Sequence, residues 1–392
     1  MEFVDLKKQY ERIKPRIHGR INEVLRHGKF IMGPEVAELE KQLASFVGCK
    51  YCVSCANGTN ALLLSLMAHD VGPGDAVFTT PFTFIATAEV ICILGATPIF
   101  VDIDPDTYNI DPGKLGKAIE ETKQKTGRSA GSTKNLTPRG IIPVDLFGLP
   151  ADYDRINDLA KQHGLFVLED AAQSLGGSYK GKRVGNLADI AATSFFPAKP
   201  LGGYGDGGAI FTNNEGMMNR LRSLREHGKG SHKYDNVRIG INGRLDTLQA
   251  AILLSKLEIF DSEIKERQEV GARYSRAFKD LVKIPHIPDG LLSAWAQYSL
   301  VTEKREAYLN KLKELGIPTA IYYPRPLHLQ AAFAHLAYRQ GDFPAAEHMA
   351  ERIFSLPMHP YLDANEQNTI IDAVKMVHNE VSKGQVSGSV KS

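Results

Sequence analysis

Two side chains that can do acid–base and covalent chemistry follow predicted strands. Lys199 lies in the stretch SFFPAKPLGGYGDGGAIF, between Pro197 and Pro200 and before a glycine-rich turn. A stiff, mostly uncharged setting favours the neutral amine, which can bond to a carbonyl carbon. Asp170 ends the apolar run LFVLED, so the two side chains can meet at one edge of a sheet. A helix N-cap at Asp170, or a plain salt bridge between the pair, would explain the same residues.

A small turn and an aromatic pair add two further features. Asn57, Gly58 and Thr59 lie between a predicted strand and a predicted helix. Free backbone N–H groups and the positive end of a helix dipole suit a phosphate there, although strand–Gly–helix turns are common. Phe82 and Phe84 follow another strand end. An aromatic ring at that place either stacks on a planar ligand or packs in the core.

These features together suit one cofactor, pyridoxal phosphate. It needs a lysine to form a Schiff base, an acid beside its pyridine nitrogen, a phosphate-binding turn and a flat surface for its ring. Lys199 would be the lysine and Asp170 the acid that keeps the ring nitrogen protonated. The sequence therefore predicts a pyridoxal-phosphate site.

Apolar, β-rich runs alternate with helical patterns over the first two thirds of the chain. Such alternation predicts a mostly parallel sheet with helices on both faces, an α/β fold that collects ligands at the carboxyl ends of its strands. The expected strands are 51–55, 76–80, 97–103, 140–145, 165–170, 190–196 and 207–213. The expected helices are 60–69, 83–94, 111–121, 153–163 and 215–227, then a long helical segment over 245–281.

The 392 residues divide into a large and a small predicted domain. Residues 1–255, with the N-terminal helix, form the expected cofactor-binding domain. Residues 256–380 form a smaller α+β domain, with a strand in AQYSLV and helices near 304–315, 344–354 and 364–380. The basic, Gly/Ser/Thr-rich stretch 122–139 predicts an exposed loop, and the tail 381–392 is expected to be disordered.

Composition points away from several classes of partner. With 47 basic and 45 acidic residues, the net charge of +2 gives no electrostatic case for nucleic acid or an anionic membrane. The N-terminus MEFVDLKKQYERIKPRI lacks the apolar core of a signal peptide, and no apolar run approaches the roughly 20 residues that span a bilayer. We therefore expect a soluble cytoplasmic protein.

Three of the four cysteines fall in CKYCVSC, which invites comparison with a metal site. Side chains alternate along a strand, so Cys52 and Cys55 should point to opposite faces. No second Cys pair or His-x-x-x-His follows. We expect buried, reduced thiols and no metal.

The motifs of the chain, in their order along the sequence, resemble those of the DegT/DnrJ/EryC1/StrS family of sugar aminotransferases. This family is a branch of the fold-type I pyridoxal-phosphate enzymes, with the aspartate-aminotransferase-like fold. The resemblance covers about residues 1–380. The motifs that carry it are GPEVAELE, CANGTNAL, PFTFIATAE, VDIDPDTYNID, LEDAAQS, SFFPAKPLGGYGDGGAIF, INGRLDTLQAAIL and SLPMHPYL. It implies a seven-stranded sheet, a homodimer with shared active sites, and L-glutamate as the amino donor.

The resemblance also implies individual roles. Lys199 and Asp170 are the implied Schiff-base lysine, which also moves the proton, and the pyridinium partner. The other implied cofactor contacts are Gln173 at the phenolic oxygen side of the ring, Phe84 stacked on it, Gly58, Thr59 and Ser194 around the phosphate, and Asn242 reaching the phosphate of the neighbouring subunit.

Within the family, the sequence resembles those of enzymes that aminate UDP-2-acetamido-2-deoxy-3-oxo-glucuronate for bacterial surface polysaccharide such as O-antigen. Arg244 would then bind the sugar carboxylate across the dimer interface, or form an ordinary interface salt bridge. Tyr322, Tyr323 and His328 would lie near the sugar. Tyr322 stands where this subgroup usually has histidine, which keeps a 4-keto-deoxysugar nucleotide as an alternative substrate.

Three other classes of function fit the sequence less well. Relatives that dehydrate sugars carry histidine in the lysine position, whereas Lys199 is present here. A non-catalytic regulator would not need Lys199, Asp170 and the phosphate turn together. A nicotinamide dehydrogenase is disfavoured because no G-x-G-x-x-G opens a helix after the first strands.

Overall fold

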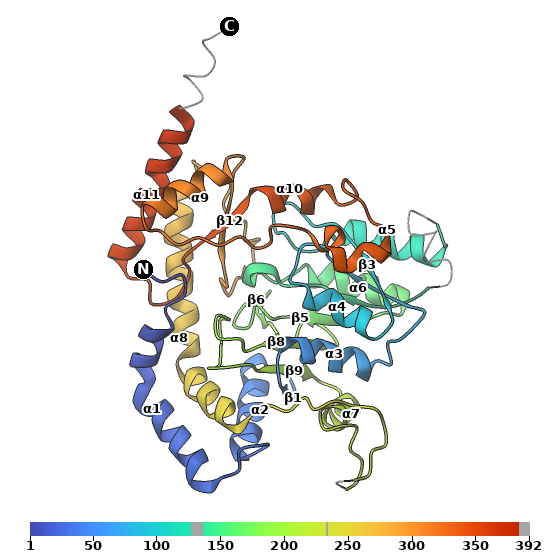
Figure 1. The fold of residues 1–392 in the computed structure, drawn as a ribbon. Coiled ribbons are helices and arrows are strands. Elements are labelled where there is room, and N and C mark those ends of the chain that lie inside the picture. Colours follow the sequence, from blue (N-terminus) through green and yellow to red (C-terminus); the bar gives the residue numbers. More distant parts are fainter. Residues whose placement is uncertain (127–135, 233, 384–392) are drawn as a thin grey trace.

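A seven-stranded sheet forms the centre of the chain in the computed structural model, which describes residues 1–126, 136–232 and 234–383 (Figure 1). The strand order is β1-β9-β8-β5-β4-β2-β3, and only β9 runs antiparallel to its neighbours. The expected mostly parallel α/β sheet is therefore confirmed. Its strands are β1 (Tyr51–Cys55), β2 (Asp75–Thr79), β3 (Thr97–Phe100), β4 (Thr137–Ile142), β5 (Phe166–Asp170), β8 (Ile190–Ser194) and β9 (Gly208–Thr212).

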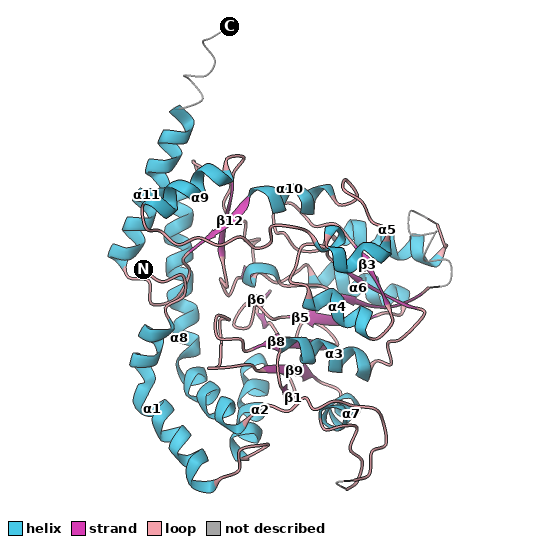
Figure 2. Ribbon diagram, viewed as in Figure 1, coloured by secondary structure: helices cyan, strands magenta, loops and turns pink. Residues whose placement is uncertain are grey.

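Helices cover both faces of this sheet. In Figure 2 its magenta strands lie among cyan helices. Alternation along β9 explains the two layers: Ile210 packs under α3 and α7, whereas Ala209 and Phe211 pack under α2 and α8. Further along the sheet, α5 and α6 cover β2, β4 and β5 on the α2 side. The helices are α2 (Pro34–Val47), α3 (Gly58–Ala68), α4 (Ala86–Ile93), α5 (Pro112–Lys123), α6 (Tyr153–His163), α7 (Glu215–Arg225) and α8 (Thr247–Phe278).

The C-terminal part of the chain packs on the C-terminal half of α8. Its core joins α8, the strand pair β11–β12 and the last helix around Tyr274, Tyr298 and Phe354. Helix α1 lies alongside the N-terminal half of α8, with Ile13 and Ile17 packed against Ile252 (Figure 1). The elements are α1 (Leu6–His27), β11 (Tyr298–Val301), α9 (Arg305–Glu314), α10 (Pro344–Arg352), β12 (Ile353–Leu356) and α11 (Ala364–Lys383). The predicted boundary at residue 255 falls inside α8, and the division into two domains stays a prediction.

Several element bounds differ from the sequence-based expectation. Strand β4 begins at Thr137, inside the predicted loop 122–139, because it pairs with β2. The predicted helix 344–354 ends at Arg352, where β12 takes over and pairs with β11. Residues 381–383 continue α11 and do not belong to a tail. Residues 127–135 of the predicted loop and 384–392 of the predicted tail lie outside the described residues.

A small three-stranded sheet was not anticipated. It consists of β6 (Ser178–Tyr179), β7 (Lys182–Arg183) and β10 (Leu291–Leu292), and it joins the turn after β5 to the segment before β11. Two-residue strands leave too little alternation to be recognised in a sequence.

The predicted placement of Cys52 and Cys55 on opposite faces of their strand is confirmed, whereas Cys49 is only partly buried. Cys52 packs in the layer under α2 and α8, whereas Cys55 packs under α3, and both thiols are free. Burial raises the pKa of the Cys55 thiol to about 12. Across residues 1–126, 136–232 and 234–383, no cluster of three or more His, Cys, Asp and Glu side chains is arranged to hold a metal ion. Of the helices in those same ranges, none has the length and apolar character needed to cross a membrane.

Candidate active site

Four strand ends bring the predicted site residues to one edge of the sheet. The register pairs Ser194 with Gly208 and Gly208 with Cys55, so the ends of β8 and β1 lie on either side of the start of β9. Asp170 ends β5, which pairs in parallel with β8. Strand β2 ends at the same edge and leads into the turn that carries Phe84.

Lys199 lies in a tight turn beyond β8. Its backbone N–H donates to Phe196 O over 2.9 Å, and its side chain is half-buried. Desolvation lowers the pKa of the Lys199 ammonium, and the charge of Asp170 opposes this effect. The lysine is thus biased towards the neutral amine that bond formation with a carbonyl carbon requires.

Asp170 is only 4% exposed, and its carboxylate is held by two donors. Its Oδ2 accepts the Thr87 hydroxyl over 2.8 Å, and its Oδ1 accepts the Ala172 N–H over 3.2 Å. Burial raises the pKa of Asp170, while Thr87, the Ala172 N–H and Lys199 each lower it. A turn follows Asp170, not a helix, so the N-cap interpretation is wrong. A buried acid held in this way fits a partner for a protonated ring nitrogen.

Gly58 and Ser194 form a close-fitting cradle at the start of α3. A Cβ on Gly58 would lie 2.7 Å from Ser194 Cβ, closer than side-chain atoms can pack, so only glycine allows this approach. Asn57 caps α3 by accepting the Asn60 N–H over 2.7 Å. The first N–H groups of a helix lack intrahelical partners, so those of Gly58 and Thr59 can bind a phosphate.

The two phenylalanines after β2 have different environments. Phe82 is fully buried in the core, whereas Phe84 is 55% exposed at the edge of the sheet. The Phe84 ring centroid lies 6.5 Å from that of Tyr323, in a tilted arrangement. Phe84 is therefore the one of the two that is free to stack on a planar ligand.

Gln173 connects this edge to Tyr323. Its Oε1 accepts the Phe147 N–H over 2.7 Å, and its Nε2 donates to the Tyr323 hydroxyl over 3.0 Å. Because the backbone donor fixes the carbonyl end of the amide, the NH₂ end faces Tyr323. Gln173 thus acts as a donor on the Tyr323 side of the site.

The remaining predicted residues lie elsewhere within this chain. Asn242 is exposed in the segment between α7 and α8, where it pairs with Glu226, and Arg244 nearby is half-buried. The Tyr322 ring contacts Phe3, with centroids 6.4 Å apart. The implied cofactor and substrate contacts of these side chains stay predictions.

His328 is more enclosed than a residue at an open sugar site needs to be. The residue is 2% exposed, and its Nε2 lies 3.0 Å from Glu347 Oε1. Burial lowers the pKa of the imidazole, against the effect of Glu347. Its predicted contact with a sugar also stays a prediction.

Sequence reasoning missed several residues near the site. Thr87, which bonds to Asp170, lies in the quoted motif PFTFIATAE, but its role depends on a contact 83 residues along the chain. A small cavity adjoins Lys199 and is lined by Arg267 and His359 from the C-terminal part and by residues 4–6. No local pattern in the sequence marks these distant neighbours.

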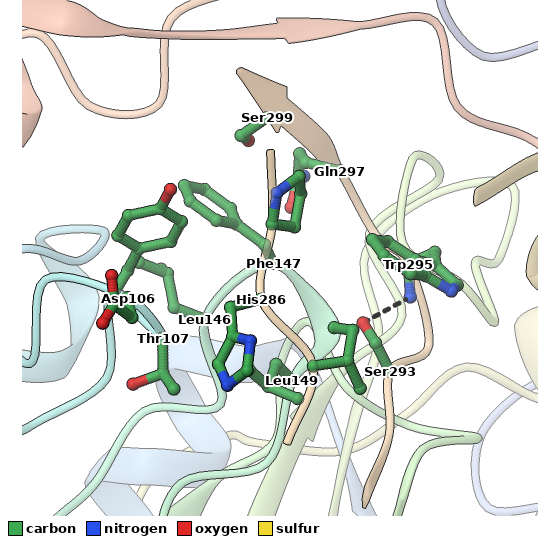
Figure 3. Close-up of a pocket in the computed structure, with 13 residues that line it drawn as sticks. Asp106, Thr107, Leu146, Phe147, Leu149, His286, Ser293, Trp295, Gln297 and Ser299 are labelled. Atoms are coloured by element: carbon green, nitrogen blue, oxygen red, sulfur yellow. Dashed lines mark hydrogen bonds between the residues drawn. The ribbon is translucent and has the colours of Figure 1, made fainter. Parts of the chain in front are cut away.

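Figure 3 shows a separate pocket. It is lined by Tyr108, Phe147, Trp295 and His286, among others, and none of the predicted site residues lines it. All three aromatic residues have φ between +49° and +63°. Phe147 links the pocket to the site because its N–H holds Gln173.

The comparisons with known proteins agree with this arrangement. The sequence matches the DegT/DnrJ/EryC1/StrS aminotransferase family over residues 11–375. The chain belongs to this family. It is 51% identical over 366 residues, which is 93% of this chain and 96% of the relative, to the UDP-2-acetamido-2-deoxy-3-oxo-D-glucuronate aminotransferase of Pseudomonas aeruginosa.

Solved structures give the same family and indicate the cofactor. A DegT/DnrJ/EryC1/StrS aminotransferase from Brucella abortus superposes with a TM-score of 0.93 at 49% identity, covering 96% of this chain and 99% of that one. NtdA from Bacillus subtilis, solved with its bound cofactor PMP, gives 0.83 at 26% identity, covering 96% and 83%. This family member is therefore a pyridoxal-phosphate-dependent aminotransferase, as the sequence predicted. The Gly58 cradle, the buried Asp170 carboxylate and the half-buried Lys199 fit that cofactor.

Proposed function

We propose that this aminotransferase moves an amino group from L-glutamate to the 3-keto carbon of UDP-2-acetamido-2-deoxy-3-oxo-glucuronate, for a bacterial surface polysaccharide such as O-antigen. The observation that carries the reaction type is the placement of Lys199 and the buried Asp170 at one edge of the sheet. The substrate rests on the 51% identity to the Pseudomonas aeruginosa enzyme.

Bound pyridoxal phosphate supplies an electron sink and carries the amino group between the two substrates. Lys199 Nζ is the base that takes the proton from the α carbon of glutamate, and it returns a proton to C3 of the sugar. Its lowered pKa suits both roles, because it keeps the neutral amine available as the base and makes the ammonium form a better proton donor. Asp170 would stabilise the positive charge at the ring nitrogen, and Phe84 would cover one ring face.

Arg244 is the proposed partner of the sugar carboxylate, presented to the active site of the neighbouring subunit. A guanidinium binds a carboxylate through two parallel hydrogen bonds, which lysine cannot reproduce. The proposal therefore includes a homodimer whose active sites are shared. We also propose that this homodimer is cytoplasmic. Asn242 would contact the phosphate of the partner's cofactor, and Tyr322, Tyr323 and His328 would line the sugar site.

The first test is the absorption spectrum of the purified enzyme before and after L-glutamate is added. We expect the band of lysine-bound cofactor to convert to that of its aminated form, and the 3-oxo uronate nucleotide to reverse the conversion. No cofactor band after reconstitution would contradict the enzymatic assignment. Conversion by glutamate without reversal by this sugar would contradict only the substrate.

Arg244→Lys tests how the carboxylate is recognised. We expect kcat/KM for the uronate to fall about 10- to 100-fold, since a charge-assisted hydrogen bond contributes about 1.5–3 kcal/mol. Turnover of the analogue with a hydroxymethyl group in place of the carboxylate should not change. Arg238→Lys is the matched control, because Arg238 lies in the same segment and bonds to Ser223 within the chain. An equal loss for both sugars would identify Arg244 as an interface residue.

A 4-keto-deoxysugar nucleotide is the second candidate substrate, favoured by Tyr322 at the position where this subgroup usually has histidine. Such a sugar has no carboxylate, so it would not need Arg244. Assaying both sugars with the glutamate-loaded enzyme decides between them. Faster amination of the 4-keto sugar would replace the uronate in the proposal.

A further inference from the structure

Thr87 is the one side chain that bonds directly to the Asp170 carboxylate in the described residues. It is 1% exposed, and its Oγ1 lies 2.8 Å from Asp170 Oδ2. A second hydroxyl follows behind it, because Thr83 Oγ1 lies 3.1 Å from Thr87 Oγ1 and is also buried. We propose that Thr83 and Thr87 form a hydroxyl chain that fixes the rotation of the Asp170 carboxylate against the cofactor ring, which makes Thr87 a positioning residue for the reaction.

The direction of this chain follows from the chemistry of its members. An ionised carboxylate only accepts hydrogen bonds, so the Thr87 hydroxyl must donate its single proton to Asp170. The lone pairs of Thr87 Oγ1 are then free to accept the Thr83 hydroxyl. The carbonyl of Phe84, 3.3 Å from Thr87 Oγ1, competes for the same proton. The shorter, charge-assisted bond to Asp170 is the stronger of the two.

The two donors on Asp170 restrain both of its oxygens. Thr87 holds Oδ2, and the Ala172 N–H holds Oδ1 over 3.2 Å. A carboxylate bonded at both oxygens cannot rotate about its Cβ–Cγ bond without losing a hydrogen bond. Each oxygen still has a lone pair, so one of them can face the protonated ring nitrogen.

The same short segment also carries Phe84, the predicted ring-stacking residue. The N–H of Thr87 donates to Phe84 O over 3.3 Å at the start of α4, so the two residues share one helical turn. This turn therefore fixes the surface under the ring and the orientation of its acid partner together. Burial raises the pKa of Asp170, and of the groups that lower it Thr87 has the largest effect.

The test measures the dissociation constant and absorption spectrum of pyridoxal phosphate with matched threonine variants. Thr87→Val keeps the shape and removes the hydroxyl, and we expect the dissociation constant to rise about 10- to 100-fold, the range for a charge-assisted bond. Thr87→Ser restores the hydroxyl and should stay within about threefold of wild type. Thr83→Val should give a smaller loss, because it removes only the outer link of the chain.

Thr79→Val is the control for the loss of a buried threonine hydroxyl. Thr79 lies in β2, and its Oγ1 donates to the Ile142 carbonyl over 2.9 Å, with no bond to Asp170. We expect unchanged cofactor affinity in this variant. Thr87→Ala provides a second removal of the hydroxyl should the valine variant fail to fold, which thermal unfolding of the apoenzyme checks.

The inference rests on the proposed role of Asp170, so Asp170→Asn is measured in parallel. If that variant binds the cofactor with the affinity and spectrum of wild type, the role of Asp170 itself is wrong. If Asp170→Asn changes both but Thr87→Val and Thr87→Ala change neither, only the positioning role of Thr87 is overturned. An equal loss in Thr79→Val would likewise overturn it, by showing a general effect on folding.

Discussion

Gly58→Ala probes the fit between the start of α3 and Ser194. Gly58 is the first residue of α3, and its φ is not in the left-handed region, so alanine is compatible with its backbone. The added Cβ, however, would lie 2.7 Å from Ser194 Cβ, 3.1 Å from Ser194 Oγ and 3.3 Å from Ser194 Cα. The effect of the substitution therefore comes from crowding and not from backbone strain.

The size of the effect follows from these distances. Carbon atoms pack at about 3.5–4.0 Å, so Ser194 must move away by roughly 1 Å. Overpacking of this kind costs about 1–3 kcal/mol of stability, against which alanine gains about 0.4–1 kcal/mol through the unfolded state. A shift of that size also breaks the predicted bond of Ser194 to the phosphate. We expect the dissociation constant of pyridoxal phosphate to rise about 10- to 100-fold, as for one charge-assisted hydrogen bond.

The assay is titration of the apoenzyme with pyridoxal phosphate, followed by absorbance, with urea unfolding of the apoenzyme beside it. Gly19→Ala is the matched control, because Gly19 lies exposed within α1 and nothing approaches its added Cβ within 4 Å. That control should gain about 0.5–1 kcal/mol of stability and bind the cofactor normally. A Gly58→Ala enzyme with wild-type affinity and stability would refute the close-packed phosphate cradle.

Three further changes test other features of the chain. Lys199→Ala should abolish turnover while leaving the circular dichroism unchanged, since it removes both the covalent anchor and the proton-transfer base; product formation at the wild-type rate would disprove the assignment. Burial lowers the pKa of the fully buried Lys256 to about 8, so between pH 8 and about 10.4 the unfolded chain binds more protons and stability should rise with pH. Lys256→Met should remove this rise of about 3 kcal/mol from urea-unfolding curves measured across that range, and a rise that persists would contradict it. Glu40→Gln should lower the free energy of unfolding by about 3 kcal/mol, because the buried Arg225 loses the carboxylate 2.6 Å from its Nη1 and keeps only Glu226, 3.7 Å from its Nη2, as a charged partner. Glu23→Gln, at an exposed pair, should produce no measurable change in the same assay.

The order of strands and helices could be predicted from the sequence because each element carries its own periodic pattern. The seven strands of the main sheet were all recognised from apolar runs, and their parallel arrangement follows from the helices between them. The edge at which Lys199, Asp170 and Gly58 meet follows in turn, because the carboxyl ends of parallel strands lie together. Fold class and cofactor could thus be predicted from local patterns, as could Lys199 and Asp170 as the candidate catalytic pair.

The tertiary structure decided what depends on neighbours distant in the chain. Phe82 and Phe84 have the same type and nearly the same position in sequence, but only packing makes one of them buried and the other exposed. Strand β12 begins within the last two residues of the predicted helix 344–354, because β11 supplies its hydrogen-bond partners. Thr87 and Phe147 were missed for the same reason, since each acts through a hydrogen bond to a residue more than 20 positions away. Periodicity and turn chemistry report on the nearest few residues, whereas the orientation of a buried carboxylate or amide depends on groups that only the folded chain brings within 3 Å.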